Sequence, residues 1–541
     1  MDQWFKRAII YQVYPRSFFD TNNDGIGDLK GVIVKLPYLK KLGVNTIWIN
    51  PVFVSPQIDN GYDVSNYFAI DSQMGTMDDF EELIRTVHRM KMRIIVDFVM
   101  NHTSDQHPWF QDAINNRQSI YHDYYLWKES EDGREPNNWG SFFGGSVWEP
   151  NPNNRNEYYF HLFDKKMPDL NWKNPEVQRS VTDIAKFWVK KEIDGIRLDA
   201  FIHIAKADFT QDFISNSNEE FPIAEIMYSN RIELRNYLRG FISELKQINP
   251  ELFILGEAAS ANADLIADYA SQNHNLCDEV ISFYHFADDR TKNNHQLNFE
   301  FQPVKLDLAA FKGKMLEFQS KLQNVCLPVL YWSNHDMARI ATRYGDPEFV
   351  KESAKALATT LYLQRGVPII YYGEEIGMQN EQRDSLNDFD DIKVKQFHKE
   401  ALNQGYTDKQ VLHMVNLTHK KCARGWMRWD DIRVTSKDSV FSFYQSVLKL
   451  KQQPLFIEGK EIILELGEHI FAYRREQKYE KAWVICNLSR EKQTVVAPQY
   501  KKILLKQSGV KMVGGKIMLP AWTSIVLLDK VEDQNDTEDK Y

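Results

Sequence analysis

Four acidic side chains stand at or near the ends of apolar segments in this 541-residue chain. Asp97, Asp199, Glu257 and Asp336 occur in the segments DFVMNH, GIRLDA, ILGEA and WSNHD. A charged group beside a buried segment costs free energy unless it is paired or used. One such acid is equally well explained by a helix N-cap or a buried ion pair. Four of them, two in segments that also carry a histidine, predict an acid-rich functional site.

The residue types favour hydrolysis of a glycosidic bond, which needs one carboxylate as nucleophile and a second as general acid. Asp199 is the predicted nucleophile because Arg197 lies two residues earlier on the same strand face and favours the ionised carboxylate. Glu257 follows an apolar run, whose burial raises the pKa of a carboxyl group and suits a proton donor. Metal-assisted hydrolysis is the alternative, but the sequence has no H-E-x-x-H pattern or tight histidine cluster.

Three further residues complete the predicted site. Asp336 would be a third acid that bonds sugar hydroxyls and favours substrate distortion. His102 and His335 are suitable hydrogen-bond donors to the hydroxyl groups of a sugar ring.

Short apolar runs alternate with amphipathic helical stretches through most of the chain, which predicts a parallel sheet. Eight such runs are the number that closes a (β/α)8 TIM barrel, an α/β fold whose chemistry sits where the strands end. The predicted strands are Ala8–Tyr14, Val44–Asn50, Arg93–Val99, Gly195–Ala200, Leu252–Glu257, Val280–Tyr284, Cys326–Ser333 and Val367–Tyr372.

Breaks in this alternation predict the domain boundaries. Residues 1–101 and 173–454 would form the barrel, and 102–172 a B domain inserted after strand 3 and covering the barrel mouth. A second irregular stretch, 379–436, follows the eighth strand. Short alternating strands over 455–528 predict a C-terminal antiparallel β domain, and 529–541 a charged tail.

Composition excludes several classes of protein. A net charge of −9 argues against nucleic-acid binding and against a polybasic membrane contact. The four cysteines are widely spaced, as in a reduced cytoplasmic protein, and the N-terminus lacks the apolar core of a signal peptide. We therefore expect a cytoplasmic protein, monomeric or weakly homo-oligomeric, whose partner is a small oligosaccharide.

The four acidic segments, with GVNTIWINP before them and GVPIIYYGEEIG after, resemble the α-amylase family, glycoside hydrolase family 13. The likeness is strongest to its α-glucosidase and oligo-1,6-glucosidase branch and extends from Trp4 to about Leu528. The resemblance implies a retaining mechanism with Asp199 as nucleophile, Glu257 as acid/base and Asp336 as transition-state stabiliser.

The resemblance also implies a pocket for the nonreducing glucose. Tyr62, His102, Arg197 and His335 would surround that sugar, with Tyr62 as its stacking ring. Asp59 would pair with Arg424 and close the pocket at the sugar 4-hydroxyl, as in exo-acting relatives. Among the 70 aromatic residues of the chain, three are placed at the sugar pocket: Tyr62, Phe143 and Phe163.

The residue after the nucleophile, Ala200, bears on the linkage that is cleaved. Ala at this position resembles enzymes that prefer α-1,4 bonds, so we expect an exo-α-glucosidase acting on maltose and short malto-oligosaccharides, together with transglucosylation. Oligo-1,6-glucosidase and trehalose-6-phosphate hydrolase are the alternatives among enzymes. Outside enzymes, a catalytically silent carbohydrate-binding or transporter-associated scaffold is the alternative. Met167 replaces the Gln usual in the branch, which removes an amide near the pocket.

The segment DTNNDGIGDL resembles the first half of an EF-hand loop, but it lacks the final Glu. One structural Ca²⁺ is predicted here, and the alternative is a turn with Asx-type self-bonding. Related α-glucosidases carry Ca²⁺ on this kind of loop. The predicted ligands are the side chains of Asp20, Asn22, Asp24 and Asp28 and the carbonyl of Ile26.

Overall fold

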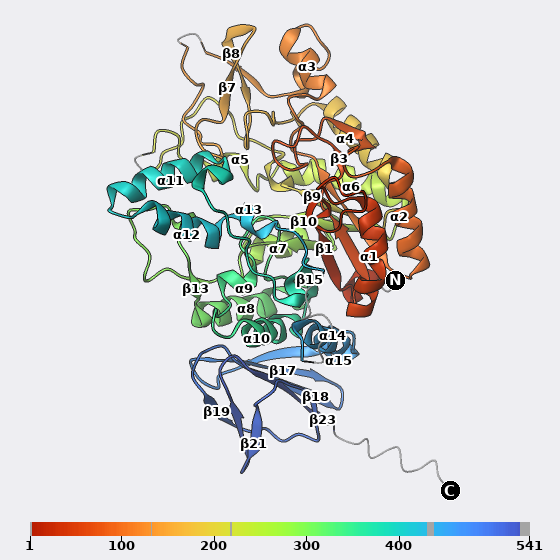
Figure 1. The fold of residues 1–541 in the computed structure, drawn as a ribbon. Coiled ribbons are helices and arrows are strands. Elements are labelled where there is room, and N and C mark those ends of the chain that lie inside the picture. The colour runs from red at the N-terminus through yellow and green to blue at the C-terminus, as the bar shows by residue number, and fades with distance from the viewer. Residues whose placement is uncertain (1–2, 131–132, 217–218, 430–437, 531–541) are drawn as a thin grey trace.

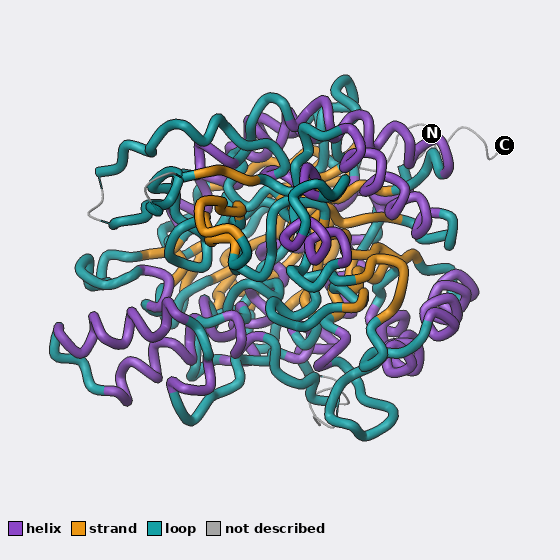
Figure 2. Tube along the Cα trace, turned by 90° about the horizontal axis from the view of Figure 1, so that it is seen from above, coloured by secondary structure: helices purple, strands orange, loops and turns teal. Residues whose placement is uncertain are grey.

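The computed structural model describes residues 3–130, 133–216, 219–429 and 438–530. Its centre is a sheet of eight parallel strands in the order β11-β10-β9-β5-β2-β1-β15-β14 (Figures 1 and 2). The end strands β11 and β14 also lie against each other, which closes the barrel. The strands are β1 Ile10–Val13, β2 Thr46–Ile49, β5 Arg93–Val99, β9 Gly195–Asp199, β10 Phe253–Glu257, β11 Glu279–Ile281, β14 Val329–Leu330 and β15 Val367–Tyr371. The predicted barrel is confirmed, and each predicted strand contains the observed one, except that β11 begins one residue early.

Helices surround the strands because each carries an apolar face at helical spacing. In α2, for example, Phe80, Leu83, Ile84 and Val87 are buried, and a capping box of Thr76 and Asp79 begins the helix. The helices around the barrel are α1 Leu29–Leu42, α2 Met77–Arg89, α4 Pro175–Val189, α6 Leu234–Ile248, α7 Ala263–Tyr269, α8 Leu308–Leu322, α10 Val350–Tyr362 and α14 Val440–Lys451.

Two segments extend from the barrel in Figure 1, the first above it and the second at its left side. The first, after β5, contains α3 Pro108–Asn115 and an antiparallel sheet of β6 Trp127–Glu129, β7 Trp148–Asn151 and β8 Asn154–Phe160. The second contains α11 Ile392–Asn403, α12 Asp408–Thr418 and α13 Lys420–Ala423. The prediction that 379–436 is irregular is therefore wrong for its described part. Val394, Phe397 and Ala401 on α11 pack into a separate small core.

The C-terminal β domain packs against the barrel helices α8, α10 and α14, at the bottom of Figure 1. Its sheets are antiparallel, with strand orders β16-β17-β18-β23-β20 and β19-β22-β21. The strands are β16 Lys460–Leu464, β17 Ile470–Gln477, β18 Glu480–Asn487, β19 Gln493–Val496, β20 Lys502–Lys506, β21 Lys511–Val513, β22 Lys516–Leu519 and β23 Ser524–Lys530. Most of the predicted charged tail, 531–541, lies outside the described residues. Within the described parts of the chain, no helix combines the length and apolar character needed to cross a bilayer.

A buried carboxyl group three residues after β15 makes stability depend on pH. Glu374 accepts hydrogen bonds from the hydroxyls of Tyr362 and Tyr444, and burial raises its pKa from 4.5 to about 8. The fold therefore favours the protonated form, and this stability is lost as pH rises from about 4.5 through about 8.

We expect the midpoint of thermal unfolding to fall less steeply in Glu374→Gln than in the parent protein over this pH range. The amide keeps an acceptor for the tyrosines but does not titrate. Scanning unfolding at several pH values checks this, and parallel profiles of the two proteins would contradict it.

Candidate active site

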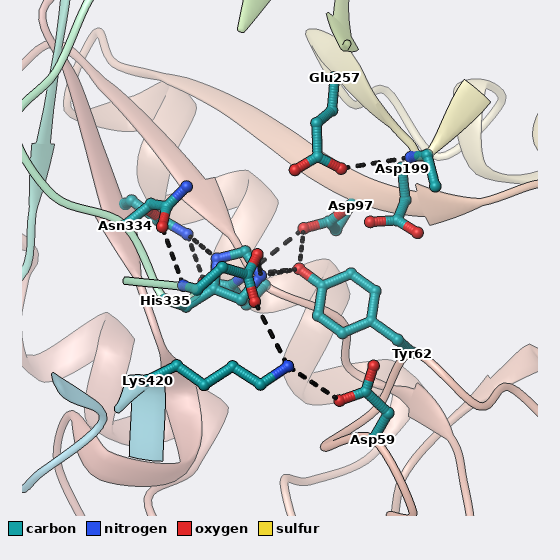
Figure 3. Close-up of polar contacts among 12 residues, drawn as sticks. Asp59, Tyr62, Asp97, Asp199, Glu257, Asn334, His335 and Lys420 are labelled. Atoms are coloured by element: carbon teal, nitrogen blue, oxygen red, sulfur yellow. Dashed lines mark hydrogen bonds and ion pairs between the residues drawn. The ribbon is translucent and has the colours of Figure 1, made fainter. Parts of the chain in front are cut away.

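The register of the barrel strands brings the predicted acids together. Asp97 on β5 lies opposite Arg197 on β9, and Val99 lies opposite Asp199 at the strand ends. Glu257 is the last residue of β10, which pairs with β9 on its other side. Because parallel strands of a barrel end at one face, these side chains converge above the barrel core (Figure 3).

Arg197 binds three carboxylates at once. Its Nη1 lies 2.7 Å from Asp97 Oδ1 and 2.5 Å from Asp199 Oδ1, and its Nη2 lies 2.7 Å from Glu257 Oε2. The arginine side chain is only 1% exposed. Charge-assisted hydrogen bonds of this kind fix both position and direction, so Arg197 holds the predicted nucleophile and acid in one frame.

Burial and the charge of Arg197 have opposite effects on the pKa values of Asp199 and Glu257. Burial raises the pKa of Asp199 well above its usual range, Arg197 lowers it, and the neighbouring carboxylates raise it again. Burial likewise raises the pKa of Glu257 against the effect of Arg197. The predicted contact of Arg197 with Asp199 is present and favours the ionised carboxylate, while burial and the neighbouring carboxylates act against it. One guanidinium cannot neutralise three buried carboxylates.

Asp336 has the opposite environment. Burial would raise its pKa, but His335 lowers it when that ring is protonated, and the cations Lys420 and Arg424 lower it as well. Its Oδ1 lies 3.1 Å from Arg424 Nη2 and 4.0 Å from Lys420 Nζ. Asp336 is therefore held as a carboxylate while Asp199 and Glu257 favour protonation, which separates the acids by environment.

The predicted pair of Asp59 with Arg424 is not formed. Arg424 instead donates to Asp336 and, through Nε, to the His335 carbonyl at 2.7 Å. Lys420, one turn earlier, lies 4.0 Å from both Asp59 Oδ1 and Asp336 Oδ1 and bridges the two acids (Figure 3). Lys420 was not among the predicted residues, although it lies four residues before Arg424, about one helical turn away.

His335 and Tyr62 form a stacked pair, with ring centroids 5.3 Å apart and planes 8° apart. The Tyr62 hydroxyl lies 2.6 Å from His335 Nε2 and donates to Asp97 Oδ2 at 2.9 Å. Gln12 Nε2 lies 2.8 Å from His335 Nδ1. Burial lowers the pKa of His335 to about 3, so the ring is a neutral hydrogen-bonding group at working pH.

Three rings line the side of the cavity that domain B covers. His102 and Phe163 lie 5.3 Å apart between centroids, and Phe163 and Phe143 lie 5.7 Å apart. His102 Nε2 is buried without a hydrogen-bond partner, and burial lowers the pKa of this ring. A neutral imidazole nitrogen left unpaired at a cavity wall is suited to a ligand hydroxyl.

The cavity has a volume of approximately 1510 Å³, and the predicted residues Asp59, Tyr62, His102, Phe143, Phe163, Asp199, Ala200, Glu257, His335, Asp336 and Arg424 line it. Met167 lines it too, so an apolar side chain occupies the position where the branch usually has an amide.

Lys206 and Asp169, which were not predicted, contact the backbone segment that carries His102. Lys206 donates to Asn101 at 2.9 Å and pairs with Asp169 at 2.6 Å, all within the core. Asp169 belongs to the MPDLNW segment and forms a β-bridge with His102. The buried ion pair therefore joins domain B to the segment after β9, and hydrogen bonds of both partners to Asn101 join it to the end of β5.

Ala200 adopts a left-handed backbone conformation, with φ 46° and ψ 28°. Its amide donates to Glu257 Oε2 at 3.3 Å. This conformation is strained for a residue with a Cβ and more so for a β-branched one. A small side chain at this position therefore limits the strain of the backbone and also leaves room in the cavity.

The predicted metal loop bonds to itself in the structure. Asp20 accepts hydrogen bonds from the amides of residues 22, 23 and 25, and Asp24 accepts one from Ile26. Asp28 accepts from Thr21 and caps α1 through Gly31. The described residues contain no group of three or more His, Cys, Asp or Glu arranged to hold a metal. Calcium binding stays a prediction, which titration of the metal-free protein with Ca²⁺ tests.

A (β/α)8 barrel with paired carboxylates at its strand ends defines a glycoside hydrolase of the two-carboxylate type. The model "Alpha amylase, catalytic domain" matches residues 12–459, and "Alpha-amylase SusG C-terminal domain" matches 470–526. The chain belongs to the α-amylase family, glycoside hydrolase family 13.

Relatives and solved structures agree with this assignment. An oligo-1,6-glucosidase of Halalkalibacterium halodurans is 36% identical, with 90% of each chain covered. A solved "Family GH13_31 enzyme" is 45% identical with a TM-score of 0.89, covering 98% of this chain and 100% of that one. The trehalose-6-phosphate hydrolase of Bacillus licheniformis has a TM-score of 0.87 at 29% identity, covering 98% of this chain and 100% of that one.

The bridge from Lys420 to two acids yields a test. Lys420→Met keeps the side-chain length and removes the charge, so we expect kcat/KM to fall about 2-fold to 5-fold, the worth of a partly exposed ion pair. Lys421→Met is the matched control because Lys421 donates instead to the Asp388 carbonyl. Steady-state kinetics on an α-glucoside measures both variants, and equal activity of the two would contradict the assigned contact.

Proposed function

We propose that this hydrolase is a retaining exo-α-glucosidase that releases single glucose units from the nonreducing ends of short oligosaccharides, with α-1,6 bonds preferred. The observation that carries exo action is the Asp59–Lys420–Asp336 ion group in the wall of the catalytic cavity. Such a group offers charged hydrogen-bond partners to a terminal sugar hydroxyl. Transglucosylation, in which a sugar replaces water as acceptor, belongs to the same proposal.

The chemistry proceeds by two displacements. Glu257, protonated in the free site, donates its proton to the leaving oxygen while Asp199 attacks the anomeric carbon. Asp199 must be ionised for that attack, and Arg197, 2.5 Å away, stabilises this form. Glu257 then takes a proton from the incoming water or sugar, whose oxygen bonds to the anomeric carbon while the bond to Asp199 breaks and releases its carboxylate.

We base the proposed linkage on the names of the relatives and not on Ala200, the residue after the nucleophile. Relatives that cover most of this chain are named oligo-1,6-glucosidase, and one from Streptococcus pneumoniae is named glucan 1,6-alpha-glucosidase. Ala200 favoured α-1,4 action in the sequence analysis. Its left-handed backbone supplies a separate reason for a small residue, so its size says less about the linkage. Maltose-type α-1,4 action is therefore the second candidate.

A phosphorylated substrate has less support. The cations that line the cavity in the described chain have partners of their own. Arg383 pairs with Glu381 at 2.8 Å, and Lys393 pairs with Glu300 at 2.8 Å. A phosphate-binding site needs unpaired basic groups that converge on one point.

Initial rates on isomaltose, maltose and trehalose 6-phosphate distinguish α-1,6 action, α-1,4 action and action on a phosphorylated substrate. We expect glucose release from all accepted substrates, with isomaltose cleaved several-fold faster than maltose and trehalose 6-phosphate slowest. A faster rate on maltose would overturn the linkage proposal and restore the α-1,4 reading. Release of larger sugars from the nonreducing end of a maltohexaose would overturn exo action.

A further inference from the structure

A second cavity lies at the end of the barrel opposite to the catalytic one. Asp199 and Glu257 are the last residues of β9 and β10, whereas Glu279 is the first residue of β11 and Arg365 lies two residues before β15. Glu279 and Arg365 line this second cavity, together with Lys460, the first residue of β16 in the C-terminal domain. Its volume of approximately 770 Å³ is within the range of small-molecule sites.

Glu279 places a hydrogen-bond donor at this cavity. The side chain is 1% exposed, and burial raises its pKa well above the usual range, by more than the Leu327 amide and Arg365 lower it. Its Oε1 accepts from the Leu327 amide at 3.1 Å, and its Oε2 is buried without a partner. The protonated carboxyl group therefore carries its proton on Oε2, where that proton needs an acceptor.

Arg365 adds another donor without an acceptor. Its Nη2 donates to the carbonyls of Gln323 and Cys326 at 2.8 and 3.1 Å, while its Nη1 is buried without a partner. Burial lowers the pKa of Arg365 and the neighbouring Glu279 raises it, so the two groups lie close together. Neighbouring donors that lack a protein acceptor fit a ligand group that only accepts, such as a carboxylate or a phosphate.

The acids of the lining do not oppose an anion. Asp278 lies 2.8 Å from Lys246 Nζ, and Glu458 lies 3.8 Å from Arg7 Nη2. Burial raises the pKa of Glu461 as it does that of Glu279, which weakens the negative charge of both.

Basic and amide side chains complete the lining. Lys6 and Lys460 are exposed and, like the guanidinium of Arg365, form no ion pair within the described residues. Carboxamide side chains also line the cavity, and these offer both donors and acceptors to hydroxyl groups. They are Gln272, Asn273, Asn275, Gln323 and Asn324. The lining therefore suits an anion that also carries hydroxyl groups.

We propose that the second cavity binds a hydroxylated organic anion, with its phosphate or carboxylate group at Arg365 and Glu279 and its hydroxyl groups at the carboxamides. The anionic oxygens accept from Arg365 Nη1 and from the carboxyl proton, so both buried donors gain partners. Binding stabilises the folded protein, because the site forms only when the barrel and β16 are in place. The proposal does not depend on the exo-α-glucosidase function, because Asp199, Glu257 and Asp336 lie outside this lining.

Calorimetry and thermal unfolding with four probes test the proposal: glucose 6-phosphate, gluconate, inorganic phosphate and glucose. We expect glucose 6-phosphate or gluconate to raise the midpoint of unfolding and to bind more tightly than inorganic phosphate, and the tighter of the two identifies the anionic group. Failure of both organic anions to bind overturns the proposal. Inorganic phosphate that binds as tightly as either of them overturns the role of the hydroxyl groups.

The Lys6→Met/Lys460→Met double variant assigns this binding to the second cavity. Both lysines are exposed, so the core stays intact, and we expect affinity for the organic anion to fall about 3-fold to 10-fold. Lys40→Met/Lys41→Met removes the same charge from exposed positions on α1 and is the matched control, which should leave the affinity unchanged. Equal affinities of the two double variants overturn the site, and so does equal loss of glucose binding in Lys6→Met/Lys460→Met.

Glu279→Gln and Glu279→Met distinguish a donor at this position from an acceptor. The amide of Gln keeps a donor beside the anion, so we expect Glu279→Gln to bind like the parent protein. Met has no donor, so we expect Glu279→Met to bind about 5-fold to 10-fold more weakly. Lost binding in Glu279→Gln would overturn the protonated donor. Cleavage of an α-glucoside by these variants reports on the proposed function alone.

Discussion

One buried guanidinium, that of Arg197, faces three carboxylates at the C-terminal end of the barrel. Burying several charges together is favourable only when geometry and hydrogen bonds are well matched. The parallel register of β5, β9 and β10 supplies that match because it sets Asp97 beside Arg197 and places Asp199 and Glu257 at neighbouring strand ends. Burial and the neighbouring carboxylates raise the pKa of Glu257, which is the shift that a general acid requires.

Around this centre the fold supplies two different walls. Domain B contributes the aromatic rings and is fastened to the barrel by the buried pair of Lys206 with Asp169. The α11–α13 segment, with its own small core, contributes Lys420. The two walls meet where Lys420 Nζ lies 4.9 Å from the ring centroid of Phe143. Strain at Ala200 is tolerated because the strands and Glu257 fix the backbone there.

The sequence was most informative about the barrel. Parallel strands covered on both faces read as continuous apolar runs, so their positions and the acids that follow them could be predicted. The partner of Arg424 could not be predicted, because a long side chain reaches whichever acid the loop geometry brings near. Residues 379–436 were predicted as irregular because lysines and histidines hide the apolar spacing of Val394, Phe397 and Ala401. The direction of the pKa shift at Asp199 could not be predicted from Arg197 alone, because it depends on all the neighbouring charges.

The account depends on Asp199 forming a covalent bond to glucose, which retains the anomeric configuration after two inversions. Proton NMR of the first glucose released from an α-glucoside reads this outcome directly, before mutarotation mixes the anomers. The account predicts that α-glucose appears first in the parent protein, and that this signal is lost in Asp199→Asn. β-Glucose as the first product would contradict it.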